Sequence, residues 1–195
     1  MVKTIPSELM VTDVSITNYH RVYSTESMSG IETRRDSGVQ WYRGTITLQA
    51  YGFDNVRRLN GFLAGLKGKL HPFALPLGGA YANPQIKRNP NLNGAAGIGV
   101  TSMKVFHTGG DICAGSVFTV PNDTKLYTLL DDLETNETSA LTFTPAFKKA
   151  HVNLEEINFM APVITALLDS NETTVVHQGN GKLSTATISW REQLT

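Results

Sequence analysis

Apolar and polar residues alternate over residues 42–51, which is the pattern of a half-buried β-strand. Ile46, Leu48 and Ala50 fall on one face of this segment, and polar residues stand between them. Further along, apolar residues recur at steps of three and four, which predicts one amphipathic helix over residues 53–68. The apolar stripe of this helix consists of Val56, Leu59, Phe62, Leu63 and Leu66.

The ends of the predicted helix also carry signals. Asp54 is expected to accept hydrogen bonds from the free amides of the first turn, and Gly68 is expected to end the helix. Residues 73–77 then return to alternation, so residues 39–77 predict strand, helix and strand. A helix of this length is marginal in water and must be held by packing. We therefore interpret it as a scaffold that plugs a β-barrel or sandwich.

The N-terminal part combines weak strand character with a polar stretch. Residues 24–36 contain few apolar side chains, and Arg34, Arg35 and Asp36 form their charged end. This stretch predicts either a long hairpin arm or a mobile loop. In both cases, it could become ordered through contact with a neighbouring molecule.

The second half of the chain differs from the first in composition. Residues 78–99 are dense in glycine, proline and asparagine, which marks a long loop or a domain boundary. Short apolar runs separated by turn residues follow and predict a small antiparallel barrel. The alternating segment at residues 183–190 is expected to dock into a sheet already formed. We therefore predict a mainly β fold in which residues 1–90 and 152–195 form one domain and residues 91–151 form an inserted barrel.

Composition indicates an ordinary globular chain without a strong electric field. Its 195 residues are 41% hydrophobic, which is enough for a sizeable core. Lys plus Arg and Asp plus Glu number 17 each, so no net charge draws the monomer onto nucleic acid or an anionic membrane. A net charge near zero suits a protein that assembles. No apolar stretch has the length of a signal peptide core or a membrane span, so we expect synthesis and folding in a cytoplasm.

The sequence contains no constellation of catalytic or ligand-binding residues. The single cysteine, Cys113, excludes an internal disulfide and a cysteine-based zinc site, and is expected to be a small buried residue. The five histidines stand far apart and are expected at the surface or in loops. There is no nucleophile elbow and no glycine-rich phosphate loop with a lysine. We therefore predict no catalytic residue, no cofactor and no metal, and a protein that is not an enzyme.

Several short motifs follow one another in a distinctive order. A strand carries Gly38 and Trp41, the predicted helix ends in Leu-Lys-Gly, and a Pro-Phe-Ala-Leu-Pro-Leu strand occupies residues 72–77. The later motifs are Gly110-Asp111, Ala114-Gly115, Val117-Phe118, residues 125–129 and the closing Ser189-Trp190-Arg191-Glu192. Their succession resembles the distal tail protein of long-tailed (siphovirus-type) bacteriophages, in the short form with a small inserted barrel.

This resemblance implies a tail-tube-like β domain that closes into a ring, commonly hexameric, around the DNA channel. The insert would resemble an oligosaccharide/oligonucleotide-binding (OB) barrel. The ring would sit at the distal end of the tail in the virion, after assembly in the host cytoplasm. Expected partners are copies of the chain, the tail tube protein and the tail-tip hub, with fibre or collar proteins as further candidates. DNA would pass through the lumen without specific binding, and no membrane would take part. The residues assigned to the subunit interface are Arg34, Arg35, Asp36, Trp41 and Trp190.

Three other functions remain open at this point. The small barrel could bind a host-surface saccharide, although residues 95–150 contain no tryptophan and Tyr127 as their single tyrosine. The phenylalanines of this region, Phe106, Phe118, Phe143 and Phe147, are expected in its core. A cell-wall hydrolase lacks a nucleophile or metal set here. Another structural part of the tail, such as a terminator, is the third alternative.

Overall fold

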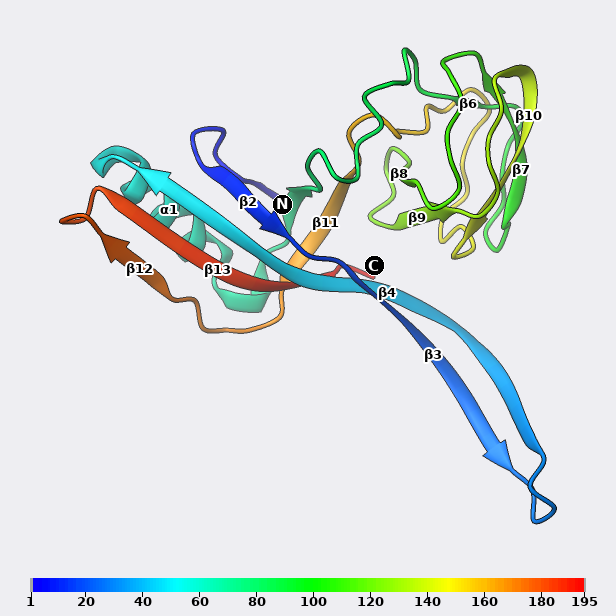
Figure 1. Cartoon of the computed structure of the whole chain (residues 1–195), viewed down its shortest axis with the longest axis horizontal. Coiled ribbons are helices and arrows are strands. Elements are labelled where there is room, and N and C mark those ends of the chain that lie inside the picture. Colours follow the sequence, from blue (N-terminus) through cyan, green and yellow to red (C-terminus); the bar gives the residue numbers. More distant parts are fainter. Residues whose placement is uncertain (1, 195) are drawn as a thin grey trace.

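Two β-sheets make up the structure, and a two-stranded arm projects from the larger one (Figure 1). This computed structural model describes residues 2–194, apart from the side chain of Glu137. Strands account for 47% of the chain and helical turns for 9%, which confirms a mainly β fold with one packed α-helix. The helix covers the larger sheet, and the smaller sheet stands beside it (Figure 1).

The larger sheet has eight strands and unites both ends of the chain. Its order is β1-β5-β11-β13-β4-β2, with β3 added to β4 and β12 added to β13. The pair β1 and β5 is parallel, and the other pairs are antiparallel. The strands are β1 (Lys3–Thr4), β2 (Met10–Val14), β3 (Thr17–Glu26), β4 (Glu32–Tyr51), β5 (Phe73–Pro76), β11 (Val163–Leu168), β12 (Val175–Gln178) and β13 (Leu183–Glu192).

The central pair of this sheet is β4 and β13. Their antiparallel register runs from Tyr51 opposite Leu183 to Arg43 opposite Arg191. Every second side chain of β13 from position 184 to position 192 is buried, because successive side chains of a strand point to opposite faces. A slip by one residue would turn the buried side chains to solvent, so the core fixes this register.

The helix α1 (Phe53–Leu66) packs its apolar stripe into the core of the larger sheet. All five side chains expected in that stripe are buried. Phe62 meets Phe73 of β5 edge-on, with ring centroids 6.0 Å apart. The helix therefore serves as packing for the sheet, as a short amphipathic helix must.

The start of α1 differs from the prediction. Asp54 does not cap the helix, because Gly52 occupies the N-cap position with φ 89° and no side chain accepts a hydrogen bond there. The Asp54 carboxylate instead pairs with Arg57 one turn on, at 3.2 Å. At the other end Lys67 takes the left-handed conformation ahead of the predicted Gly68, which begins a short 3-10 turn.

The smaller sheet has five antiparallel strands in the order β6-β7-β10-β9-β8. Its two edge strands are both bridged by residues 155–158, through Asn91 opposite Glu156 and Thr119 opposite Asn158. This segment therefore closes the sheet into a small barrel. The strands are β6 (Asn91–Leu92), β7 (Ser102–His107), β8 (Val117–Thr119), β9 (Leu126–Leu129) and β10 (Asn136–Thr144).

Aromatic rings fill the small barrel. Phe118 and Tyr127 stack with centroids 5.4 Å apart, and Phe143 and Phe147 lie 4.4 Å apart beside them. Phe106 is an exception to the predicted core, because it is 41% exposed on the outer face of β7. Three further core residues, Ile86, Ile157 and Phe159, lie outside residues 91–151, so the packed unit is longer than the predicted insertion at both ends.

We predict that Gly44→Ala lowers the free energy of unfolding by about 1–3 kcal/mol, the usual cost of overpacking. A Cβ at Gly44 would lie 1.8 Å from the backbone oxygen of Ser15 and 3.2 Å from Cζ2 of Trp190, so the backbone must shift. Gly61→Ala is the matched control, since a Cβ there meets nothing within 4 Å in the middle of α1. The control should gain up to about 1 kcal/mol from helix propensity. Urea denaturation measures both, and equal effects would contradict the prediction.

Candidate functional site

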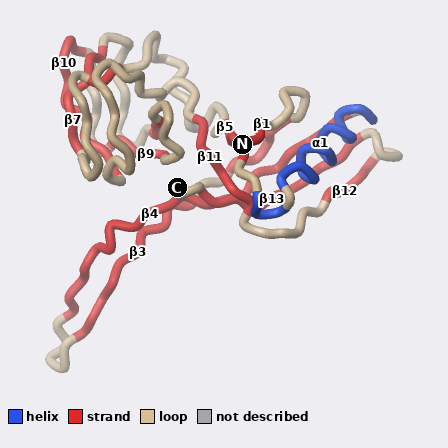
Figure 2. The backbone as a smooth tube through the Cα atoms, turned by 180° about the vertical axis from the view of Figure 1, so that it is seen from behind, coloured by secondary structure: helices blue, strands red, loops and turns tan. Residues whose placement is uncertain are grey.

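The arm consists of β3 and the first half of β4. The two strands pair from Thr17 opposite Arg43 to Glu26 opposite Glu32, and they extend away from both sheets (Figures 1 and 2). All ten residues of β3 are exposed. Of the two interpretations of the polar N-terminal stretch, the structure therefore shows the hairpin arm. A ribbon of two strands buries little apolar surface, so it depends on the sheet at its base for its position.

Both outer edges of the arm are unpaired within the described residues. On one side β3 is itself an edge strand, and on the other side β4 meets β13 only from Arg43 onward. Such edges present rows of backbone donors and acceptors to a further strand. At the tip, Met28 is fully exposed and Ile31 is 66% exposed. The arm therefore offers both hydrogen-bonding groups and apolar side chains to a partner.

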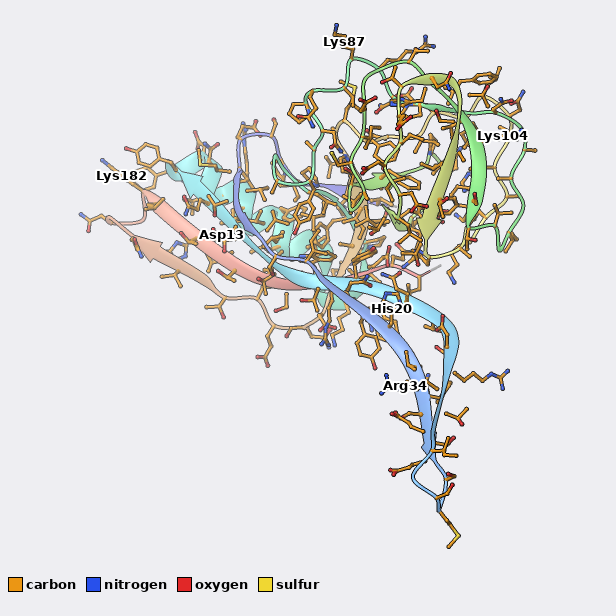
Figure 3. The ribbon with its side chains drawn as sticks, turned by 45° about the vertical axis from the view of Figure 1, so that its right-hand side comes forward. Asp13, His20, Arg34, Lys87, Lys104 and Lys182 are labelled. Carbon is orange, nitrogen blue, oxygen red and sulfur yellow. The ribbon has the colours of Figure 1, made fainter. Side chains whose placement is uncertain are left out.

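The residues assigned to an interface from the sequence fall in different places. Arg34, Arg35 and Asp36 lie exposed on the arm, and Figure 3 shows Arg34 projecting from it. The Arg34 guanidinium contacts the carboxylate of Glu32 at 2.7 Å. Trp41 is partly buried at the root of the arm, where its ring lies 4.3 Å from that of Tyr19.

Trp190 corrects the interface prediction. Its side chain is fully buried in the core of the larger sheet, so it offers no surface to a partner. The alternation along β13 places it on the same inner face as Ile188 and Ala186, opposite Gly44. The sequence pattern already indicated this face, and the assignment to an interface was wrong.

A groove of about 530 Å³ lies at the root of the arm. Its apolar side chains are Trp41, Leu167 and Leu194, and its cations are Arg43 and Arg191. The remaining lining residues are Asp169, Glu192 and Gln193. The Arg43 guanidinium also lies 5.7 Å from the centre of the Tyr19 ring. The groove thus joins apolar surface with positive charge.

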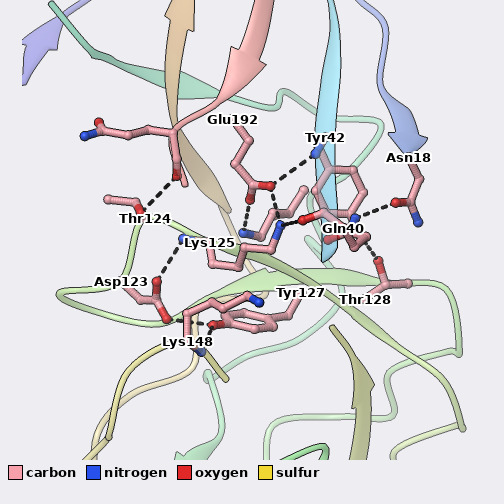
Figure 4. A network of polar contacts seen from close by, with 12 residues as sticks. Asn18, Gln40, Tyr42, Asp123, Thr124, Lys125, Tyr127, Thr128, Lys148 and Glu192 are labelled. Atoms are coloured by element: carbon pink, nitrogen blue, oxygen red, sulfur yellow. Dashed lines mark hydrogen bonds and ion pairs between the residues drawn. The ribbon is translucent and has the colours of Figure 1, made fainter. Parts of the chain in front are cut away.

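A buried ion pair connects the small barrel to the larger sheet beside this groove (Figure 4). The ammonium of Lys125 contacts the carboxylate of Glu192, and both side chains are buried. The same ammonium donates to the backbone oxygen of Gln40 at 2.8 Å. The carboxylate also accepts from the backbone N–H of Tyr42 at 3.1 Å and of Leu126 at 2.8 Å. Both charges are therefore compensated, as buried charges must be.

Further polar contacts surround this pair (Figure 4). Asp123 accepts from the Tyr127 hydroxyl at 2.6 Å and from the Lys125 backbone N–H at 3.0 Å. The Tyr42 hydroxyl and the Thr128 hydroxyl lie 2.6 Å apart across the junction. We call the residues Tyr42, Lys125 and Glu192 with these partners the polar joint. It fixes the small barrel to the strand that continues into the arm.

Burial shifts the pKa values of the ion pair in opposite directions. Desolvation raises the pKa of the Glu192 carboxyl, and the charge of Lys125 and the two backbone N–H groups oppose this rise. Desolvation lowers the pKa of Lys125, against the attraction of Glu192. Each partner therefore opposes the neutralisation of the other by burial, and removal of either one leaves the other without its compensating charge in the interior.

The candidate residues for chemistry lie in unexpected environments. Cys113 is exposed in the turn region before β8, where a buried position was expected. His107 and His151 are buried, where surface or loop positions were expected. In these positions the His107 ring bonds the Gly110 backbone oxygen, and the His151 ring contacts Glu155 at 3.1 Å. Over the described part of the chain, no group of three or more His, Cys, Asp and Glu side chains is placed to hold a metal ion. Residues 2–194 also contain no helix of sufficient length and apolarity to span a membrane.

Comparison with protein-family models and with curated proteins finds no match for this chain. The arm, the groove and the polar joint therefore carry the functional argument. Sequence reasoning found the arm as one of two options and missed the polar joint. Lys125 and Glu192 are separated by 67 residues, and neither stands in a local pattern that points to the other.

We predict that Lys125→Met lowers the free energy of unfolding by about 3–5 kcal/mol at neutral pH, because Glu192 then remains buried and unpaired. The double variant K125M/E192Q should recover much of this loss, because glutamine has no charge and keeps an oxygen that accepts a backbone N–H. Lys104→Met is the control, since Lys104 is exposed and should change stability by at most about 0.5 kcal/mol. Urea denaturation of the wild type and these three variants measures the differences in the free energy of unfolding.

The loss in Lys125→Met should also depend on pH. Burial places the pKa of Glu192 in the folded state above its unfolded value. The charge of Lys125 opposes this rise, so its removal raises the pKa of Glu192 further. The penalty of the unpaired carboxylate is therefore full above the folded-state pKa and declines as the pH falls from there toward the unfolded pKa. The stability difference between wild type and Lys125→Met should narrow from neutral to mildly acidic pH. A difference that is constant with pH would show that the charge of Glu192 is not its cause.

Proposed function

We propose that the protein is a structural virion protein, the distal tail protein of a long-tailed bacteriophage. In this role copies of the chain form a ring, with six as the expected number, around the DNA channel. The ring joins the tail tube to the tail-tip hub, with fibre or collar proteins attached nearby. The observation that carries this proposal is the exposed two-stranded arm on a sheet that is backed by one helix.

The arm has the properties of an assembly element. An isolated two-stranded ribbon is marginally stable in water, and its open edges invite pairing with other chains. All ten residues of β3 are exposed, so this strand adds no buried side chain to the core of its own molecule. A segment of this kind gains stability when a neighbouring subunit covers it. Head-to-tail contacts between identical chains close into rings when the rotation between copies permits it.

Two other features support the same role. The net charge is zero, so repulsion between copies is low and the lumen would not hold DNA specifically. The order of sequence motifs resembles that of distal tail proteins over most of the chain. In this proposal the protein works through its shape in the virion, without catalysis or a cofactor, after assembly in the host cytoplasm.

We predict that an arm-shortened chain folds but does not assemble. Replacing residues 23–35 by Asn-Gly joins Val22 and Asp36, which are paired in the register, through a two-residue hairpin turn. The melting temperature should change by only a few degrees, because the removed residues lie outside both cores. Electron microscopy of particles made with this chain should show no completed tails.

The matched control inserts Gly-Ser into the turn at residues 179–181 between β12 and β13, on the opposite end of the sheet. This chain should support normal tails. Normal assembly by the arm-shortened chain would refute the role of the arm. If electron microscopy of particles with labelled wild-type chain showed no label in a circular collar at the distal end of the tail, the proposed function itself would be refuted.

A second candidate function follows from the exposed ring of Phe106. It lines a hollow of about 280 Å³ on the small barrel together with Arg88, Asn89, Asn91 and Thr108. The side-chain amides of Asn89 and Asn91 are already hydrogen-bonded within the chain. The exposed aromatic ring beside the Arg88 guanidinium and the Thr108 hydroxyl suits the stacking and hydrogen bonding of a sugar. Binding of the full chain to a glycan array, lost in Phe106→Ala and retained in Leu130→Ala, would establish this function. Equal signals from all three chains would exclude the Phe106 site.

A further inference from the structure

We infer that the arm tip of one copy docks into the root groove of the next copy. The arm tip comprises residues 26–32, and the root groove is the one lined by Trp41, Arg43, Leu167, Arg191 and Leu194. This inference rests on the proposed ring and specifies which surfaces of two neighbouring subunits meet. It requires that the arm tip and the root groove are complementary in charge and apolar character. It also requires that the arm tip of a chain cannot reach the root groove of the same chain.

The arm tip is acidic and apolar. Residues 26–32 contain two glutamates and no lysine or arginine. Glu26 forms no ion pair within the described residues, whereas Glu32 is held by Arg34. Met28 is fully exposed, and Ile31 is 66% exposed. Exposed apolar side chains at the end of a projecting arm cost free energy in water and favour burial against a partner.

The root groove has the complementary composition. The guanidinium groups of Arg43 and Arg191 form no ion pair within residues 2–194, and Asp169 is the acidic side chain of the groove left uncompensated. The charge of Glu192 is already balanced by Lys125. Trp41, Leu167 and Leu194 supply the apolar surface. The groove can therefore receive a carboxylate and a pair of apolar side chains together.

The geometry requires two copies. From Glu32 to Arg43 an extended strand spans roughly 36 Å, so the tip of an arm lies far from the groove of its own chain. A tip that docks on the next copy makes a head-to-tail contact, and repetition of this contact can close into a ring. In a ring of six, adjacent grooves one arm length apart would lie at a radius of roughly 36 Å, since the side of a regular hexagon equals its radius.

Disulfide cross-linking tests this contact directly. In a full-length chain with Cys113→Ser, Met28→Cys is combined with Leu194→Cys. A disulfide needs Cα atoms within about 7 Å, so the two positions cannot bond within one chain and must bond between copies. Oxidation of concentrated protein and of assembled particles should produce a ladder of linked copies that ends at the size of the ring. The matched control places the cysteines at Ile98 and Leu194, and no ladder is expected.

Charge reversal gives a second readout. Glu26→Arg and Arg191→Glu should each lower the ladder yield by roughly tenfold or more, and the two changes combined should restore it. Glu172→Arg is the control for a reversed charge away from the arm, with no expected effect on yield.

The outcomes separate the docking from the ring. A ring visible by electron microscopy without the bond between positions 28 and 194 would overturn the docking and leave the proposed function standing. A cysteine at position 28 that links to another virion protein would also overturn the docking and identify that protein as the partner of the arm. A chain that remains monomeric in solution and is absent from a collar at the tail end would overturn both.

Discussion

The fixed register between β4 and β13 is the constraint on which the rest of the structure depends. β4 is a single strand of 20 residues, and only its second half pairs with β13. In that half, Ile46 and Leu48 are completely buried and cannot slip by one position without exposure. The first half continues the same strand beyond the core and curves as it enters the arm (Figure 1), where the pairing with β3 is irregular between His20 and Val22 and Gly38 has a φ of 67°. The core thus fixes the root of the arm, although the arm itself has no core.

The end of β13 serves two surfaces at once. Arg191 and Glu192 are adjacent, so their side chains point to opposite faces of the strand. Both residues line the root groove, and the Glu192 side chain is also buried against Lys125 in the polar joint. A buried ion pair contributes little net stability, because desolvation offsets the attraction. In the observed placement of the small barrel, both charges and the backbone N–H groups of Tyr42 and Leu126 are paired, so other placements that separate these groups are disfavoured.

The parts of the fold that were predictable are those governed by local periodicity. The alternation at Ile46 and Leu48 and the helical stripe from Val56 to Leu66 each depend on a single face against a single core, and both are buried as expected. The sequence does not distinguish a hairpin arm from a mobile loop at this stretch, because a strand exposed on both faces has no apolar period to detect. Cys113 and the buried His151 were misplaced, because their burial depends on loop paths and not on residue type.

The polar joint lies beyond local patterns for a different reason. Lys125 follows a turn and Glu192 ends a strand, which are ordinary positions for exposed charges. Their burial arises only when the small barrel docks on the larger sheet, an event that depends on contacts across 67 residues of sequence. Phe106 illustrates the opposite case: its apolar character predicted a core position, but it falls on the outer face of β7 while Val105 and His107 face inward.

The hairpin form of the arm also lowers the conformational entropy that is lost when the arm binds a partner. A disordered loop would lose conformational entropy for each residue that becomes ordered on a partner, of the order of 1–2 kcal/mol per residue. Here the strands are already paired from Thr17 to Arg43, so much less entropy remains to be lost. Charged side chains such as Arg34 and Glu32 along its length oppose indiscriminate pairing of the open edges. Preorganisation and charge together favour one specific partner surface, and the acidic, apolar tip is the part of the arm whose chemistry selects it.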